Sequence, residues 1–310
     1  MKDAATIAGS LAGLAGAGGA VSVAVRRRNR SSIPAGHALI RDTDIDPLPG
    51  VMRLRLTGMT VPVVPGPHGE LFLGAGTPQP GRTLRRLVLA PLFTRGQAGS
   101  GRLFRDQRTP FRLVVEFGGR SRDTETLLRA YRMLDQQLRD HGSLLTRCRD
   151  GVVTPGVVTV TVTGIVDVRE LLAAQRDRYA FAEGTFDDIG SRSAPPALVP
   201  AVSEPWSRRF GWDGRDPITA EERHQLHALV RAAHADGRSV RISGLPEGSR
   251  RARAAIWSEL GAAGVDAIAD ADLGGLAKHL RHHPVTATPS PPPPHAPARV
   301  TRRPSPRPLV

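Results

Sequence analysis

The sequence predicts an α/β protein folded as a single-domain TIM-type (β/α)8-like barrel, and three observations lead to this prediction. Strand-like and helix-like segments alternate from residue 33 to residue 283. Several of these segments carry clear start and stop signals. The repeated units extend over about 250 residues, the usual length of a barrel of eight such units, with a parallel sheet inside and helices outside.

The clearest units of the first half begin at Phe111. The run Phe111 to Phe117 is predicted to be a buried strand, and Asp123 is placed to cap the helix that follows. Apolar residues recur along that helix with helical spacing until Gly142 ends it. Residues 157–163 then alternate valine and threonine, which predicts a strand with valines on one face and threonines on the other.

The second half repeats this pattern. Thr219 and Glu222 are spaced as a capping box at the start of a helix that Gly237 ends. The remaining predicted elements are a strand at 239–243, a helix at 254–263, a strand at 265–269 and a helix at 273–280.

Both ends of the chain differ from the barrel region. Residues 4–25 carry no charge and a basic cluster follows at 26–30. Residues 1–32 are therefore expected to be a membrane anchor or a cleaved signal, with a flexible arm as the third alternative. The basic cluster favours membrane contact through residues 4–30 with the barrel on the cytoplasmic side; a secreted or a soluble cytoplasmic protein stays open. Residues 284–310 are Pro-rich and basic without any acid, which predicts a disordered tail.

The charge balance restricts the class of partner. The chain has 43 basic and 29 acidic residues, a net charge of +14. Such a charge suits nucleic acid, anionic lipid or phosphorylated small molecules. Aromatic residues make up only 4% of the chain and no nucleic-acid reader motif is present, so nucleic acid is not the expected partner. The lone Cys148 excludes an intramolecular disulfide framework and is expected to have a packing or a surface role.

Six motifs occur in a characteristic order along the barrel region. They lie at residues 80–84, 145–157, 173–181, 202–210, 262–268 and 272–276. Together they resemble the bacterial phosphodiesterase-like proteins related to phosphatidylinositol-specific phospholipase C and glycerophosphodiester phosphodiesterase, a group that includes the fungal altered-inheritance-of-mitochondria proteins. The resemblance implies a TIM-type barrel with Mg²⁺ or Ca²⁺ at its mouth. It also implies histidines as general acid and base, with carboxylates and the metal stabilising charge on the phosphoryl oxygens.

This chain departs from the family pattern at six positions. His37 remains from a His-Asn-Asp-type stretch, and Glu116 remains from an acid-x-Lys element in which Gly118 replaces the lysine. Residues 59–65 lack the expected Glu-x-Asp pair, and Gly74-Ala75-Gly76 stands where Gly-His-Asp is expected. The two other departures lie at 163–166 and at Ser243.

These departures predict a degenerate phosphodiesterase-like barrel, a pseudoenzyme that needs no cofactor. His37 is left as the residual candidate for a catalytic residue and Glu116 as the residual candidate for a metal ligand. A retained function would be binding of a phosphorylated or lipid-derived ligand at the mouth through Arg241. Trp206 would form a wall of that pocket, unless its loop simply packs onto the barrel.

Two alternatives stay open. The first is an active metal-dependent phosphoric diester hydrolase of the glycerophosphodiester or phosphoinositide type, using His37, Glu116 and the acidic cluster Asp42–Asp46 with Mg²⁺ or Ca²⁺. The simpler interpretation of that cluster is a solvated turn, and His224 and His227 are interpreted as a solvated helix face. The second is a membrane-tethered interaction protein acting through its basic tail.

Overall fold

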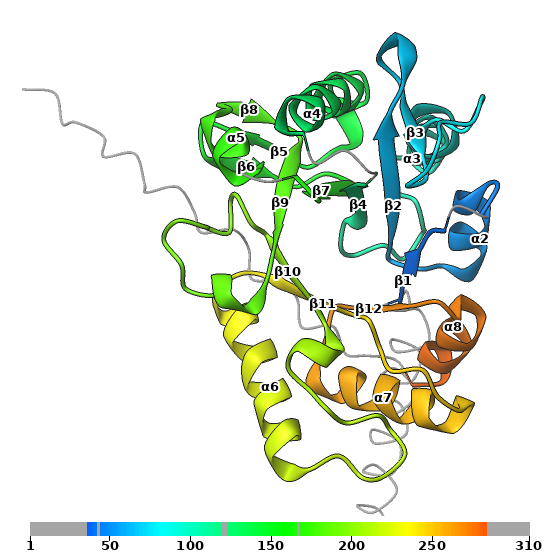
Figure 1. Ribbon diagram of the computed structural model, residues 1–310, viewed down its shortest axis with the longest axis vertical. Coiled ribbons are helices and arrows are strands. Elements are labelled where there is room, and N and C mark those ends of the chain that lie inside the picture. The colour runs from blue at the N-terminus through cyan, green and yellow to red at the C-terminus, as the bar shows by residue number, and fades with distance from the viewer. Residues whose placement is uncertain (1–35, 42–43, 119–122, 166–167, 284–310) are drawn as a thin grey trace, which may run out of the picture.

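The protein forms a closed barrel of parallel strands surrounded by helices (Figure 1). The computed structural model describes residues 36–41, 44–118, 123–165 and 168–283. The first strand, β1, pairs in parallel with both β2 and β12, so the barrel has no open edge. The predicted TIM-type barrel is confirmed. Its eight strands, in order around the barrel, are β1 (Gly36–Leu39), β2 (Gly58–Pro65), β4 (Phe111–Phe117), β7 (Val158–Thr163), β9 (Ala180–Gly184), β10 (Ala201–Pro205), β11 (Ser239–Ser243) and β12 (Ala267–Asp270).

The helices lie outside the barrel and run back from one strand to the next. They are α2 (Pro47–Leu54), α3 (Ala90–Ala98), α4 (Thr124–Arg139), α5 (Val168–Ala174), α6 (Ala220–Ala235), α7 (Arg250–Ala263) and α8 (Leu273–His282). The connection from β9 to β10 contains a single 3-10 turn, Phe186–Asp188, in place of a helix.

Side-chain caps explain where several helices begin. The Asp123 carboxylate accepts from the backbone N–H of Thr126, as the sequence predicts. Thr219 caps α6 by accepting from Glu222 N–H, but the Glu222 carboxylate accepts from the Thr219 hydroxyl and from the N–H groups of Gly211 and Trp212, not from the Thr219 N–H. Only half of the predicted capping box is therefore present. Helix α7 begins at Arg250, four residues before the predicted start, because Ser249 caps it by accepting from Ala252 N–H.

The strand pleat separates an apolar outer face from an interior that contains polar as well as apolar side chains. Val158, Val160 and Val162 of β7 belong to the core between the strands and the helices. Since side chains alternate along a strand, Thr159, Thr161 and Thr163 face into the barrel. The same alternation on the neighbouring strands brings polar and charged residues into the interior, where they form the candidate site described below.

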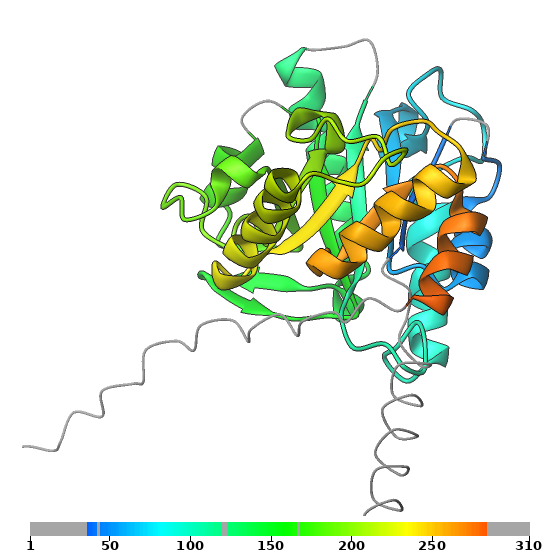
Figure 2. The ribbon, with the colours of Figure 1, turned by 90° about the horizontal axis from the view of Figure 1, so that it is seen from below.

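A small second sheet lies across the amino-terminal end of the barrel (Figure 2). It is formed by β5 (Arg147–Arg149), β6 (Val152–Thr154) and β8 (Asp177–Arg178). An Asp150-Gly151 turn with positive φ at both residues joins β5 to β6. Cys148 is buried in β5, in agreement with a packing role. A further strand, β3 (Leu71–Leu73), pairs antiparallel with β2 beyond the barrel.

The two chain ends predicted from the sequence, residues 1–32 and 284–310, lie outside the described residues, which begin at Gly36 and end at His283. Among the helices that the structure describes, none combines the length and the apolar character required to cross a membrane.

Candidate functional site

A chain of buried polar side chains lies inside the barrel. Nε2 of His37 on β1 is 2.8 Å from the Thr60 hydroxyl on β2, and Nη1 of Arg241 on β11 donates to the same hydroxyl at 3.1 Å. The Arg241 guanidinium also donates to both carboxylate oxygens of Glu183 on β9, at 3.2 and 2.8 Å. Four strands thus contribute one group each to a single network across the interior.

His37 is held as a neutral imidazole within this network. Burial lowers the pKa of His37 well below 6.5, and the charges of Arg241 and Arg112 lower it further. A neutral ring can accept at Nε2 from the Thr60 hydroxyl while that hydroxyl accepts from Arg241. Nδ1 of His37 is buried and has no hydrogen-bond partner among the described residues. The ring fits only because Gly58 lies beside it: a Cβ at Gly58 would lie 2.6 Å from Nδ1 and 2.5 Å from the Arg112 carbonyl oxygen.

A second guanidinium lies deeper in the barrel. Arg112 on β4 donates to the Ser239 hydroxyl on β11, and its buried Nη1 has no partner in the part of the chain that the structure describes. Burial lowers the pKa of Arg112, while the charges of Asp266 and Glu183 oppose that shift. Two arginines and one glutamate therefore give the interior an excess of positive charge.

The rim of the mouth is formed by the next inward-facing side chains. Glu116 of β4 is exposed and lies in register with Pro62 on β2 and Thr163 on β7. Across the barrel, Ser203 on β10 and Ser243 on β11 are half-buried. Among the residues that the structure describes, these rim positions carry one carboxylate and several hydroxyl groups.

Two positions at which the sequence departs from the family pattern, Ala75 and Gly118, are neighbours at the end of the strand that bears Glu116. A Cβ at Gly118 would lie 3.7 Å from the Ala75 Cβ, so these two positions are neighbours. Gly118 N–H donates to Val63 and Gly74 N–H donates to Pro62, which ties both segments to the end of β2. A Cβ at Gly164 would lie 2.2 Å from the Phe117 carbonyl oxygen. The missing side chains therefore belong to one side of the mouth.

The predicted site residues fall into two groups. His37 and Arg241 are joined through Thr60, and Glu116 lies at the rim above them. Trp206 is in the core: it is 1% exposed, its indole stacks on Phe210 with ring centroids 4.3 Å apart, and its Nε1 donates to Trp212. Of the two arrangements considered for this loop, packing against the barrel is the one present.

Sequence reasoning missed Thr60 and Glu183. Thr60 lies within the otherwise apolar run Met59–Pro65. Its hydroxyl is the only polar side-chain group of that run, and nothing else in the sequence marks the position. Glu183 lies 58 residues from Arg241, so no local pattern links them. The alternation of β9, Ala-Phe-Ala-Glu-Gly, would have placed Glu183 on an inner face if the strand had been recognised.

The donor set formed by the described residues does not suit a divalent cation. Within the described ranges, no group of three or more His, Cys, Asp and Glu side chains is arranged to hold a metal ion. Mg²⁺ and Ca²⁺ require several oxygen ligands, and Glu116 supplies the carboxylate at the rim. In the acidic cluster 42–46, Asp44 accepts from Arg41 N–H as in a turn, while Asp42 lies outside the described residues.

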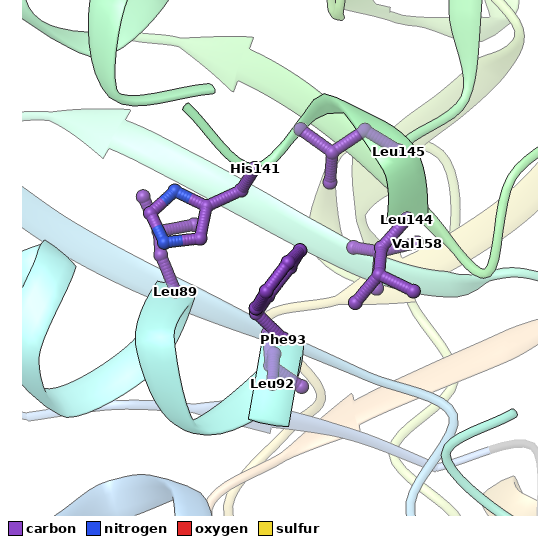
Figure 3. Close-up of a pocket in the computed structure, with 7 residues that line it drawn as sticks. All are labelled: Leu89, Leu92, Phe93, His141, Leu144, Leu145 and Val158. Carbon is purple, nitrogen blue, oxygen red and sulfur yellow. The ribbon is translucent and has the colours of Figure 1, made fainter. Parts of the chain in front are cut away.

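An apolar pocket lies away from the mouth, beside the first residue of β7 (Figure 3). His141 is its one polar lining residue. Nδ1 of His141 is bonded to the Gln137 carbonyl at 2.8 Å, and its ring meets Phe93 edge-on at 5.4 Å. The other lining residues are Leu89, Leu92, Leu144, Leu145 and Val158.

Comparison with solved structures finds matches at low sequence identity that extend over most of this chain. A glycerophosphodiester phosphodiesterase from Parabacteroides distasonis is 9% identical with a TM-score of 0.47, over 81% of this chain and 99% of that chain. One from Agrobacterium tumefaciens is 11% identical with a TM-score of 0.41, over 79% and 98%. A glycerophosphoryl diester phosphodiesterase from Parabacteroides distasonis is 13% identical with a TM-score of 0.46, over 83% and 90%. No family model matches the chain, and no curated protein matches it in sequence.

Proposed function

We propose that this chain is a phosphodiesterase-type barrel that binds a phosphorylated or lipid-derived ligand at its mouth and does not catalyse metal-dependent phosphodiester hydrolysis. The observation that carries the proposal is that Ala75 and Gly118 are neighbours at the end of the strand that bears Glu116. These are the positions at which the motif resemblance implies metal ligands and a lysine. Hydrogen atoms and a methyl group there can neither hold a cation nor transfer a proton.

The state of His37 also supports the absence of acid–base catalysis. A general acid or base works best with a pKa near the working pH and within hydrogen-bond reach of its substrate. The side chain of His37 is fully buried, its pKa is lowered well below 6.5, and its Nε2 is bonded to Thr60. This arrangement suits a structural role in the interior network.

The proposed ligand class rests on the charge beneath the mouth and on the hydroxyl groups at its rim. Arg241 and Arg112 exceed Glu183 by one charge, and the hydroxyls of Thr163, Ser203 and Ser243 lie above them. Guanidinium charge and hydroxyl donors suit phosphate oxygens. A phosphate monoester or diester on a small polyol or a lipid headgroup is the corresponding ligand class.

An activity screen tests the absence of catalysis. Purified full-length protein is incubated with glycerophosphodiesters and with bis(p-nitrophenyl) phosphate, with added Mg²⁺ or Ca²⁺ and with chelator. We expect no turnover above the protein-free rate. Metal-dependent turnover that disappears in His37→Ala would establish the active hydrolase in place of this proposal.

Calorimetric titration tests the binding. Glycerol 3-phosphate and inositol phosphates are titrated into the wild type and into Ser243→Asp, which adds a negative charge at the rim. Ser193→Asp, at an exposed position outside the barrel strands, is the matched control. Binding that is lost in Ser243→Asp and kept in the control is expected. Absence of binding to the wild type, or equal binding by all three proteins, rejects the mouth as the site.

A further inference from the structure

The amino-terminal side of the barrel carries an exposed group of arginines without acidic partners. The group, called the basic face below, consists of Arg53, Arg102, Arg105 and Arg108. All four are exposed, and none forms an ion pair with a residue that the structure describes. Arg53 lies in the last turn of α2, and the other three lie in the segment 99–110 that leads from α3 into β4.

Contacts between the two segments place these arginines together. Arg55, just beyond α2, forms an ion pair with Asp106, the only acid of the segment 99–110. Phe104 is buried, with the guanidinium carbon of Arg55 5.3 Å and that of Arg95 5.5 Å from its ring centroid. Arg95 Nε also donates to the Leu103 carbonyl at 2.8 Å. The apolar residues thus anchor the segment while its arginines point outward.

The segment is also fastened to the strand starts. Gln107 donates to the Val157 carbonyl at 2.8 Å, beside the first residue of β7. The segment lies at the lower edge of the barrel in Figure 2, on the side opposite the mouth. The basic face is therefore a fixed surface of the folded domain, separate from the proposed ligand site.

The start of β1 lies on the same side. Thr57 N–H donates to the Gly36 carbonyl and Arg112 N–H donates to Thr57, so the starts of β1, β2 and β4 are neighbours. Arg30, the last residue of the basic cluster 26–30, is six positions before Gly36. Six residues span at most about 21 Å. In sequence, the basic cluster thus precedes by a few residues the strand that begins on this side of the barrel.

We propose that the basic face binds the surface of an anionic lipid bilayer. The sequence beside it favours lipid over nucleic acid, because the uncharged stretch 4–25 immediately precedes the basic cluster and the chain has few aromatic residues for base stacking. Arginines close to anionic lipid headgroups each strengthen attachment, and the effect fades within a Debye length. In this orientation the mouth of the barrel faces away from the membrane.

Vesicle sedimentation of the full-length chain tests the proposal. Vesicles of phosphatidylcholine are compared with vesicles containing about one-third phosphatidylglycerol. The triple variant Arg102→Glu, Arg105→Glu, Arg108→Glu should bind the anionic vesicles about 100-fold more weakly than the wild type. The control variant Arg129→Glu, Arg132→Glu, Arg231→Glu changes the net charge equally at exposed helix positions and should bind as the wild type does. Binding should also fall in about 1 M salt, where the Debye length is about 3 Å.

A second measurement covers the case in which residues 4–25 alone retain the chain on vesicles. An environment-sensitive fluorophore is attached at Thr109→Cys, and at Gln225→Cys on α6 as a control; Cys148 is buried. Anionic vesicles should change the emission at position 109 only. Unchanged emission at both positions, equal loss of binding in both triple variants, or tighter binding of the wild type to duplex DNA than to anionic vesicles would each overturn the proposal.

Discussion

Arg241 and Glu183 form a two-point ion pair inside the barrel, with Nη2 of Arg241 2.8 Å from Oε2 of Glu183. Their side chains are only 7% and 6% exposed. A buried pair is costly to break from one side, because the remaining charge is left without a partner or water. This pair therefore links the stability of the barrel to the electrostatics of its mouth.

Glu183→Gln should lower the free energy of unfolding by about 3–5 kcal/mol, the usual cost of leaving one buried partner charged. The double variant Glu183→Gln, Arg241→Met removes both charges and should be more stable than the single variant. Urea unfolding of the wild type and the variants checks this. A double variant that is less stable than Glu183→Gln would contradict the assignment of the loss to an unpaired guanidinium.

His37 should make the protein less stable in acid. Because burial and then the charges of Arg241 and Arg112 lower its pKa well below 6.5, the unfolded chain binds a proton that the folded chain does not. The contribution of His37 to stability is therefore present above pH 6.5 and lost as the pH falls below it. One such proton corresponds to a slope of about 1.4 kcal/mol per pH unit.

Replacing His37 by Gln keeps a polar group near Thr60 without this titration. Denaturant unfolding at a series of pH values should show a shallower loss of stability below pH 6.5 than in the wild type. His279, whose pKa is also lowered by burial, remains in both proteins. Equal slopes in the two proteins would show that His37 takes up protons in the folded state as it does in the unfolded state.

His234 should act in the opposite direction. Its hydrogen bond to Asp266, at 2.8 Å, raises the pKa of His234, so the folded chain holds that proton more tightly than the unfolded chain. This contribution is present below pH 6.5 and is lost as the pH rises through the folded pKa. His234→Gln should therefore lower Tm more at about pH 5.5 than at about pH 8. A larger loss at the higher pH is the contrary result, read from thermal melts at both pH values.

Gly118 and Gly164 should respond differently to alanine. A Cβ at Gly118 would make an ordinary 3.7 Å contact with Ala75, so Gly118→Ala should change the free energy of unfolding by no more than about 0.5 kcal/mol. Gly164 has a φ of +83°, and a Cβ there would lie 2.2 Å from the Phe117 carbonyl oxygen. Gly164→Ala should cost about 2 kcal/mol or more. Similar stability of the two variants in urea would contradict this difference.

The sequence predicted those barrel elements well that carry a local pattern, such as a run of strand-forming residues or a helix-capping side chain. The strand at 239–243 has the predicted bounds, and Asp123 caps α4 as predicted. The sheet of β5, β6 and β8 was missed although Asp150-Gly151, with φ of 49° and 80°, is a typical two-residue hairpin turn. Its flanking strands have three residues each, too few to show a periodicity.

The site was less predictable because its partners are distant in sequence. Arg241 was expected to offer its donors to a ligand, yet Glu183 and Thr60 already accept from it. Trp206 was considered for the pocket wall, and only the packing of Phe210 and Trp212 around it reveals its place in the core. Both results depend on how strands converge, which a single sequence does not encode locally.

The pairing of β1 with β12 has a consequence for synthesis of the protein on the ribosome. The first strand of the described chain completes its hydrogen bonds only when one of the last segments, Ala267–Asp270, has been made. Until then the nascent barrel has two open strand edges, at β1 and at the most recent strand, and such edges can pair with other chains. Premature termination before residue 267 would leave this hazard permanent, so the final two elements protect the whole barrel from aggregation.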